Sequence, residues 1–375
     1  MYQRTIEKSI QDKLFKGKVI IIYGPRQVGK TTLSKKIMKE SNVKALYIQA
    51  DIASERELIS RPEPARLKAV FGDAKLVVID EAQNISDIGV ILKTFVDTYP
   101  EVQIIATGSS SFDLANKTKE PLTGRVYEFF LYPLSIEEVS NNSVLEWKSR
   151  EDFFMKYGLY PGIVNDGINE AQRSLEMIQE SYLYKDIFVL ESIKKPEVLR
   201  RLVTILAFSI GSALSVNSIA REISTTAKTI DRYLDLLEKM FVIKRLYGFS
   251  RNLPNEIKKG FKVYFIDIGI RNSIIKNHND IECRDDVGGL FENLFVMERI
   301  KYQNNHEVQS NRYFWKTYND VEVDYIEERD GMLYAFECKY KERPARSLKI
   351  FQAEYTHSNS VIVHKDNLFD CVSLK

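Results

Sequence analysis

A glycine-rich segment near the N-terminus has the residue types and spacing of a phosphate-binding loop. The run from Gly24 to Thr31 fits the pattern G-x-x-x-x-G-K-[ST]. Glycines let the loop curl so that backbone N–H groups face phosphate oxygens, while Lys30 can reach the β- and γ-phosphates and Thr31 can ligate Mg²⁺. A glycine turn before an ordinary helix is the alternative. We expect ATP and Mg²⁺ at the loop residues Gly24, Pro25, Arg26, Gln27, Val28, Gly29, Lys30, Thr31 and Thr32.

Two acids follow the apolar run Leu76–Ile79. This pattern predicts a buried strand that ends in carboxylates, at the edge of an open α/β sheet where ligands bind. Asp80 would hold Mg²⁺, usually through water, and Glu81 would act as the general base that polarises the attacking water. An exposed acidic strand end is the alternative. The order of the loop and the acids along the chain favours an ATPase.

Two further places could take part in phosphate chemistry. Thr107 and Ser109, at the end of another apolar run, could sense the γ-phosphate or position the water, although a plain loop fits equally well. Arg125 is a candidate arginine finger that would act on the nucleotide of a neighbouring subunit, because a planar guanidinium suits the charge of phosphoryl transfer. A surface salt bridge fits Arg125 equally well. The finger would imply a homo-oligomer.

A parallel sheet is needed to position these side chains. Apolar runs predict strands over 19–23, 45–49, 76–80 and 103–107, with helical segments between them and a helix from Lys30 to about Glu40. Strands that alternate with helices in this way are typical of a doubly wound α/β fold.

The motifs together resemble a known group. The segments GPRQVGKTT, LVVIDEAQ, IIATGSSS, LTGR and FFLYPLSIEE are similar to those of prokaryotic AAA+ ATPases of the archaeal-ATPase-like type, and the similarity continues into Tyr160–Gly162, Val263–Gly269 and Gly289–Asn293. The resemblance implies an ATPase core over 1–134, a helical lid over 135–195, a winged-helix segment over 196–260 and a nuclease-like domain over 261–375. It implies little about the physiological role.

The middle of the chain is locally basic. Residues 196–262 contain twelve Lys or Arg against six Asp or Glu. Short helices over 216–223 and 227–240, followed by two strand-like runs, predict a winged helix-turn-helix. Lys228 and Arg232 would meet a DNA groove, while Arg251, Lys258 and Lys259 would contact phosphate from the wing. A module that packs against protein is the alternative.

Two strands near the C-terminus are joined by Asp330-Gly331, a strong signal for a tight hairpin turn. If these two residues form the loop, Asp324 faces Glu337 across the hairpin, and the period of two places Lys339 on the same face. Carboxylates that face each other repel unless a cation lies between them. We therefore expect Asp324 and Glu337 to bind Mg²⁺, with Lys339 steadying phosphate charge.

This arrangement resembles the PD-(D/E)xK nuclease superfamily, although Val323 stands where the proline of that signature would be. The resemblance implies catalytic roles for Asp324, Glu337 and Lys339. It adds Glu292 as a further metal ligand, on a helix expected over 290–299. A nuclease fold that binds nucleic acid without cutting it, or that does neither, remains an alternative.

Composition limits the remaining choices. The chain has 375 residues, 44% of them apolar, and a net charge of +2, so a surface for DNA or RNA would have to be local. Three scattered cysteines and the lack of a long apolar run predict a cytoplasmic protein without disulfides or membrane spans. We expect a protein that couples ATP and ADP binding to nucleic acid. A regulatory switch or scaffold for a protein partner, with an inactive nuclease fold, is the other hypothesis.

Overall fold

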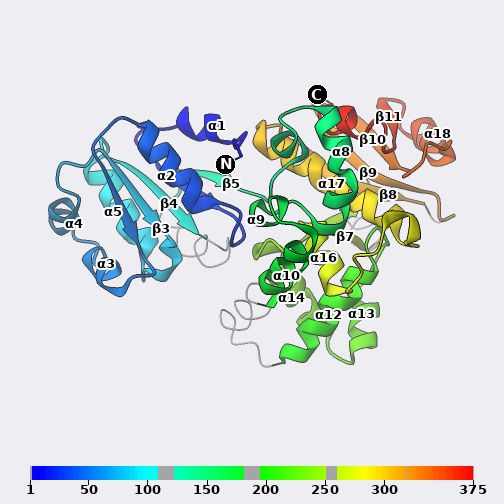
Figure 1. Cartoon of the computed structure of the whole chain (residues 1–375), viewed down its shortest axis with the longest axis horizontal. Coiled ribbons are helices and arrows are strands. Elements are labelled where there is room, and N and C mark those ends of the chain that lie inside the picture. Colours follow the sequence, from blue (N-terminus) through cyan, green and yellow to red (C-terminus); the bar gives the residue numbers. More distant parts are fainter. Residues whose placement is uncertain (1, 109–121, 181–194, 251–259, 318, 375) are drawn as a thin grey trace. The chain divides into compact units, whose positions relative to one another are not determined.

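A computed structural model describes residues 2–108, 122–180, 195–250, 260–317 and 319–374 (Figure 1). The chain forms two compact units. The first comprises Met1–Pro133 with Lys239–Phe241, and the second comprises Leu134–Glu238 with Val242–Lys375. The four predicted domains divide the chain more finely than this and stay predictions. In the part of the chain that the structure describes, no helix is both long enough and apolar enough to cross a membrane.

The first unit is built on a parallel sheet of five strands in the order β2-β3-β4-β1-β5. The four predicted strands are confirmed, and β5, whose run of aromatic and polar residues has no clear period, was not predicted. Strands β1, β3 and β4 are buried throughout, as their apolar sequences require. The strands are β1 (Val19–Tyr23), β2 (Ala45–Gln49), β3 (Leu76–Asp80), β4 (Gln103–Gly108) and β5 (Val126–Phe130).

Helices connect these strands, and the predicted helix that follows the glycine-rich loop is confirmed as α2. It packs against β3 and β4, and its apolar residues Leu33 and Ile37 are buried there. The helical elements of this unit are α1 (Glu7–Gln11), α2 (Lys30–Glu40), α3 (Ala53–Leu58), α4 (Pro64–Phe71), the 3₁₀ turn η1 (Ala82–Asn84) and α5 (Ile88–Thr98).

The second unit begins with helices, as the sequence predicts for residues from 135 onward. Ser135 and Glu138 form a capping box at the first of them, each satisfying a backbone N–H of the other. The described helices of this part are α7 (Ile136–Val139), α8 (Val144–Tyr157), α9 (Pro161–Val164) and α10 (Ile168–Ile178).

Asp267, in the motif Val263–Gly269, contacts the segment directly before the motif Tyr160–Gly162. Its carboxylate accepts a hydrogen bond from the N–H of Leu159 (2.7 Å) and caps the helix α16 (Ile268–Ile274) through the N–H of Ile270 (3.1 Å). Gly158 lies against this carboxylate so closely that a Cβ there would fall 2.0 Å from Asp267 Oδ1. Asp267 therefore ties the segment at Gly158 and Leu159 to the start of α16.

The basic middle segment forms three helices and an antiparallel strand pair, close to the predicted bounds. They are α12 (Pro196–Phe208), α13 (Val216–Ile223), α14 (Ala227–Lys239), β6 (Ile243–Gly248) and β7 (Phe261–Phe265). Leu214, before α13, also pairs with Phe261. The expected wing residues Arg251, Lys258 and Lys259 lie outside the described residues. This order of elements is compatible with a winged helix, which stays a proposal.

Strands β6 and β7 also belong to the C-terminal sheet, which has six strands in the order β11-β10-β9-β8-β6-β7. The predicted helix near Glu292 is longer than expected, and β8 was not predicted. The remaining elements are the 3₁₀ turn η3 (Ile281–Cys283), α17 (Val287–Asn305), β8 (Asn311–Lys316), β9 (Glu322–Arg329), β10 (Met332–Cys338), α18 (Arg346–Glu354), β11 (Ser358–Val363) and α19 (Leu368–Val372).

The predicted hairpin register is confirmed from Met332, which pairs with Arg329, to Phe336, which pairs with Tyr325. The neighbouring pair β8–β9 is irregular, however. Tyr313 pairs with Ile326 but Trp315 pairs with Val323, so β9 contains one more residue than β8 between these points. This is a β-bulge at positions 324 and 325.

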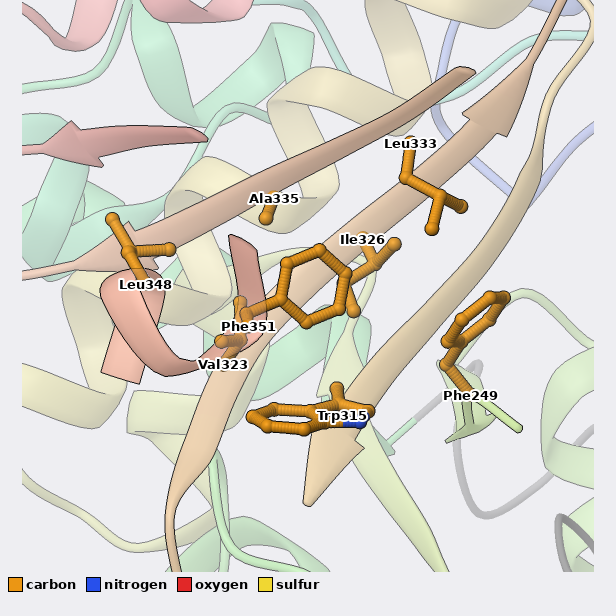
Figure 2. Packing of buried hydrophobic residues seen from close by; sticks show 8 residues of the cluster. All are labelled: Phe249, Trp315, Val323, Ile326, Leu333, Ala335, Leu348 and Phe351. Atoms are coloured by element: carbon orange, nitrogen blue, oxygen red, sulfur yellow. The ribbon is translucent and has the colours of Figure 1, made fainter. Parts of the chain in front are cut away.

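The bulge explains the packing of the sheet. Val323 and Ile326, three residues apart, both face α18 and share an apolar cluster with Phe351 (Figure 2). Tyr325 instead contacts Phe295 of α17, with ring centroids 6.0 Å apart. Helices α17 and α18 thus cover opposite faces of β9 and β10. The apolar cluster on the α18 face consists of Phe249, Trp315, Val323, Ile326, Leu333, Ala335, Leu348 and Phe351.

Candidate functional site

The glycine-rich loop joins β1 to α2 at the carboxyl edge of the parallel sheet. Gly29, directly before α2, has a φ of 97°, a conformation that favours glycine. Gly24 is constrained by a close approach, because a Cβ there would lie 2.2 Å from the carbonyl oxygen of Leu131. Both invariant glycines of the motif therefore have a structural reason in this chain. Of the other loop residues, Pro25 and Val28 are buried, whereas Arg26, Gln27 and Thr32 are exposed.

Lys30 is buried at the start of α2, and its ammonium donates to the carbonyl oxygens of Gly24 and Pro25, each at 2.9 Å. Burial lowers the pKa of Lys30 to about 8, although the carboxylates of Glu81 and Asp80 oppose that shift. An ammonium that is held only by neutral carbonyls of its own loop is well placed to exchange them for phosphate oxygens, which carry full negative charge.

Asp80 is the centre of a hydrogen-bond network at the end of β3. Its Oδ2 accepts from the hydroxyls of Thr31 (2.7 Å) and Tyr47 (2.6 Å), and its Oδ1 accepts from Thr107. The structure thus brings together Thr31, Asp80 and Thr107, as the sequence predicts. Tyr47, on β2, was missed, because nothing in the sequence marks one tyrosine of a strand as the neighbour of a carboxylate on the next strand.

Glu81 follows Asp80 with a φ of 53°, which is uncommon for a residue other than glycine and is often found at functional sites. Its N–H donates to Thr107 Oγ1 (3.2 Å), and its carboxylate accepts from Gln83. The side chain is half-buried. Gln83 belongs to the motif LVVIDEAQ, and the sequence analysis assigned it no role. In the structure, its side-chain amide donates to the Glu81 carboxylate and orients it.

One predicted participant, Arg125, lies elsewhere. Arg125 precedes β5, and its carbonyl accepts from the N–H of Val19 at the start of β1, so it lies at the sheet edge opposite the loop. Its side chain is 40% exposed and pairs with Asp97 at 2.6 Å. It therefore cannot contact a nucleotide bound to the loop of its own chain. Action on the nucleotide of a neighbouring subunit stays a prediction. Full ATPase activity of an Arg125→Ala protein would contradict that prediction. Ser109 lies outside the described residues.

A buried arginine near the N-terminus supports the loop from behind. Arg4 donates to the carbonyl of Val28 (2.8 Å) and to the carbonyl of Tyr132 (2.6 Å), which follows β5. It therefore ties the phosphate-binding loop to the segment beyond the last strand. Sequence reasoning missed this role, because at least one of the two carbonyls, that of Tyr132, is distant from Arg4 along the chain.

These observations fit a nucleotide with its metal. The loop has the backbone path that only glycine tolerates at Gly24 and Gly29, Lys30 supplies a cation, and Thr31 and Asp80 supply the oxygens that Mg²⁺ prefers. The acid that would act on water, Glu81, lies next to Asp80 at the same edge of the sheet.

The acids predicted near the C-terminus have a different arrangement from the one expected. Asp324 lies in the bulge of β9 and turns toward α17, where Oδ1 contacts the ammonium of Lys262 (3.2 Å) and Oδ2 accepts from the N–H of Cys338 (2.8 Å). Glu337 alternates with Leu333 and Ala335 of the α18 face, and its Oε1 pairs with Lys339 at 2.7 Å. The bulge breaks the alternation from which we expected the two acids to share a face.

Glu292 of α17 lies close to Asp324, as expected. Both carboxylates, however, contact the ammonium of a lysine, Lys262. Lys262 Nζ is 2.9 Å from Glu292 Oε1, which also accepts from the Tyr264 hydroxyl (2.6 Å). Burial raises the pKa of Glu292 to about 8, and the charge of Asp324 adds to this shift, while Lys262 opposes it. Burial alone would lower the pKa of Lys262, but the surrounding acids, Glu292 first, raise it well above its usual range.

In the described part of the chain, no group of three or more His, Cys, Asp or Glu side chains could hold a metal ion. No such group forms around Asp324, Glu337 and Glu292, so the expected magnesium site there has no support from the structure and stays untested. Sequence reasoning missed Lys262 because it reaches Asp324 over 62 positions of sequence.

Three family models match separate parts of the chain. Residues 16–140 match the AAA domain family. Residues 151–280 and 287–370 match two domains of unknown function, DUF8612 and DUF4143 respectively. The predicted nuclease-like character of the C-terminal region is not supported by these matches.

Relatives extend over most of the chain. An uncharacterized protein of Mycobacterium tuberculosis is 26% identical over 348 residues, which are 92% of this chain and 75% of that protein. An uncharacterized protein of Methanocaldococcus jannaschii is 24% identical over 314 residues, 72% of this chain and 65% of that protein.

Solved structures show looser likenesses. A Walker-type ATPase of Pyrococcus abyssi superposes with a TM-score of 0.49 at 18% identity, over 72% of this chain and 94% of that one. The RuvB Holliday junction branch migration motor of Thermotoga maritima gives a TM-score of 0.35 at 15% identity, over 70% and 92%. Neither score supports a conclusion about what this chain does. The strand order, the loop geometry and the AAA domain match agree, however, and the N-terminal unit has the fold of an AAA-type P-loop ATPase.

Proposed function

We propose that the N-terminal unit binds and hydrolyses ATP with Mg²⁺. The observation that carries this proposal is the network around Asp80, which joins the loop hydroxyl of Thr31 to the end of β3, next to Glu81. When bound, Mg²⁺ would neutralise charge on the phosphates. Lys30 would bind the same phosphates in place of its loop carbonyls, and Asp80 would orient the metal water shell. Glu81 would accept a proton from the attacking water.

Phosphate release from ATP by the intact chain should therefore require Mg²⁺. Asp80→Asn should abolish the release, because the amide keeps the shape of the side chain but loses the charge that faces the metal. Asp51→Asn is a matched control. Asp51 is an exposed acid two residues after β2, and its carboxylate accepts a hydrogen bond from the amide of Asn84. The proposal fails if phosphate release is the same in EDTA as in Mg²⁺, or if Asp80→Asn matches the wild type.

For the second unit, we propose that nucleotide state controls contact with nucleic acid. Support comes from α14, which exposes Lys228 and Arg232 on its N-terminal half. The acids of this helix pair with Arg245 of β6, whose guanidinium contacts Glu238 at 2.6 Å, Asp231 at 3.5 Å, and Asp235. The guanidinium thus compensates part of their negative charge, although Asp231 and Asp235 are exposed like Lys228 and Arg232.

This second proposal predicts affinity for mixed DNA or RNA that falls steeply with salt, because phosphate contacts release counterions. Arg232→Ala should weaken binding and lower the salt slope by about one. Lys148→Ala removes an exposed lysine of α8, which pairs with Asp366, and should change neither. Filter binding at two salt concentrations, with and without nucleotide, measures this. Absence of salt-sensitive binding, together with a protein partner that depends on nucleotide, would instead favour a regulatory switch or scaffold.

A further inference from the structure

The most unusual charged group of the second unit is Lys262. It lies on β7 with a side chain that is 0% exposed, and its ammonium contacts three carboxylates: Glu292 of α17 at 2.9 Å, Asp324 of β9 at 3.2 Å, and Glu322, also of β9. A buried ammonium is unfavourable unless its charge is paired and its donors are satisfied. An ammonium has three donors, and three carboxylates surround this one.

Several carboxylate oxygens of this cluster already accept hydrogen bonds. Asp324 Oδ1 accepts from Lys262, and Asp324 Oδ2 accepts from the backbone N–H of Cys338 (2.8 Å). Glu292 Oε1 accepts from both Lys262 and Tyr264. A divalent cation would have to compete for these oxygens. It would also have to approach a buried positive charge, which lies between the acids that would bind it.

The backbone reinforces this arrangement. The bulge in β9 turns Asp324 toward α17 and Lys262, away from the α18 face on which Glu337 lies. Glu337 is thereby left to pair with Lys339, and its Oε2 is buried without a hydrogen-bond partner. One unused oxygen does not make a metal site. Asp324 and Glu337, the expected pair of metal ligands, thus pair with two different lysines, although burial and the charge of Asp324 still raise the pKa of Glu337.

We propose that Lys262 is the resident cation of the cluster formed by Glu292, Asp324 and Glu322, in the position that a divalent metal would take in a nuclease site. The ammonium fixes α17, β7 and β9 to one another through charge, and the cluster does not use a metal to hydrolyse phosphodiesters. This inference is independent of ATP hydrolysis by the first unit, because the two rest on separate residues.

Binding of Mn²⁺ tests the proposal, measured by calorimetry on the full chain without nucleotide. The Asp80→Asn background removes the metal position of the first unit. In this background we expect no Mn²⁺ site that depends on Asp324. Adding Lys262→Met should create one: Mn²⁺ should raise the melting temperature of that variant, and a further Asp324→Asn change should abolish the effect. Lys316→Met is the matched control, since Lys316 also pairs with Glu322 (3.5 Å) but is one-third exposed, and it should create no site.

The proposal is overturned if the Asp80→Asn protein with Lys262 intact binds Mn²⁺ and loses that binding on Asp324→Asn or Glu337→Gln. It is also overturned if Mg²⁺ or Mn²⁺ supports nucleic-acid cleavage that Asp324→Asn removes. Both measurements use proteins that retain Lys262, so they decide the matter even if Lys262→Met does not fold.

Discussion

Lys30→Ala should remove most of the affinity for ATP. The lysine is buried beside the loop, and its ammonium now contacts only the carbonyls of Gly24 and Pro25. Loss of a desolvated charge that pairs with phosphate costs about 3 kcal/mol, or roughly a hundredfold in Kd. The fold should survive, because the change removes a buried charge whose pKa is already lowered by its desolvation.

Fluorescence titration with a labelled ATP analogue measures this effect. Lys39→Ala provides the control, since Lys39 lies in the last turn of the same helix, is exposed and contributes the same charge. It should bind nucleotide like the wild type. A Lys30→Ala protein whose Kd stays within about twofold of the wild type, a change worth only a few tenths of a kcal/mol, would show that the loop does not bind phosphate.

Glu81→Gln should leave ATP binding intact but lower turnover by about a hundredfold or more, the usual contribution of a general base. The amide has the same shape, and the backbone hydrogen bond from the Glu81 N–H to Thr107 does not involve the side chain. The left-handed backbone at this position is likewise unchanged. What is lost is a carboxylate that can accept a proton from water.

Asp87→Asn is a close control for this variant. Asp87 has nearly the same φ, 52°, and is an exposed acid before α5. Its change to an amide should affect neither binding nor turnover. Normal turnover in Glu81→Gln would exclude Glu81 as the base, whereas loss of ATP binding would mean that the residue supports the loop instead.

Local sequence predicted the first unit well. The phosphate-binding loop, its helix and the four strands β1 to β4 depend on residues that are close in sequence, such as the apolar run that ends at Asp80. Parallel strands also meet at a common edge, so the proximity of Thr31, Asp80 and Thr107 followed from the order of the elements. Tyr47 and Arg4 could not be predicted in this way, because their partners are set by side-chain reach between distant segments.

The C-terminal site shows where such reasoning stops. The Asp330-Gly331 turn predicted the hairpin register correctly, and Met332 does pair with Arg329. The bulge in β9 arises from pairing with β8, a strand whose sequence was not recognised. A single extra residue changes which face a side chain occupies. Lys262 then pairs with Glu292, Glu322 and Asp324, a cluster that residue spacing along the chain does not predict.

One site of the first unit should both bind and hydrolyse ATP. The most direct test is phosphate release from Mg²⁺-ATP, measured together with bound nucleotide on the same preparations of the wild type, Lys30→Ala and Glu81→Gln. The wild type should bind ATP and release phosphate, Glu81→Gln should bind without release, and Lys30→Ala should do neither. Phosphate release by the wild type that both variants retain in full, or no release and no bound ATP in any of the three proteins, would contradict the claim.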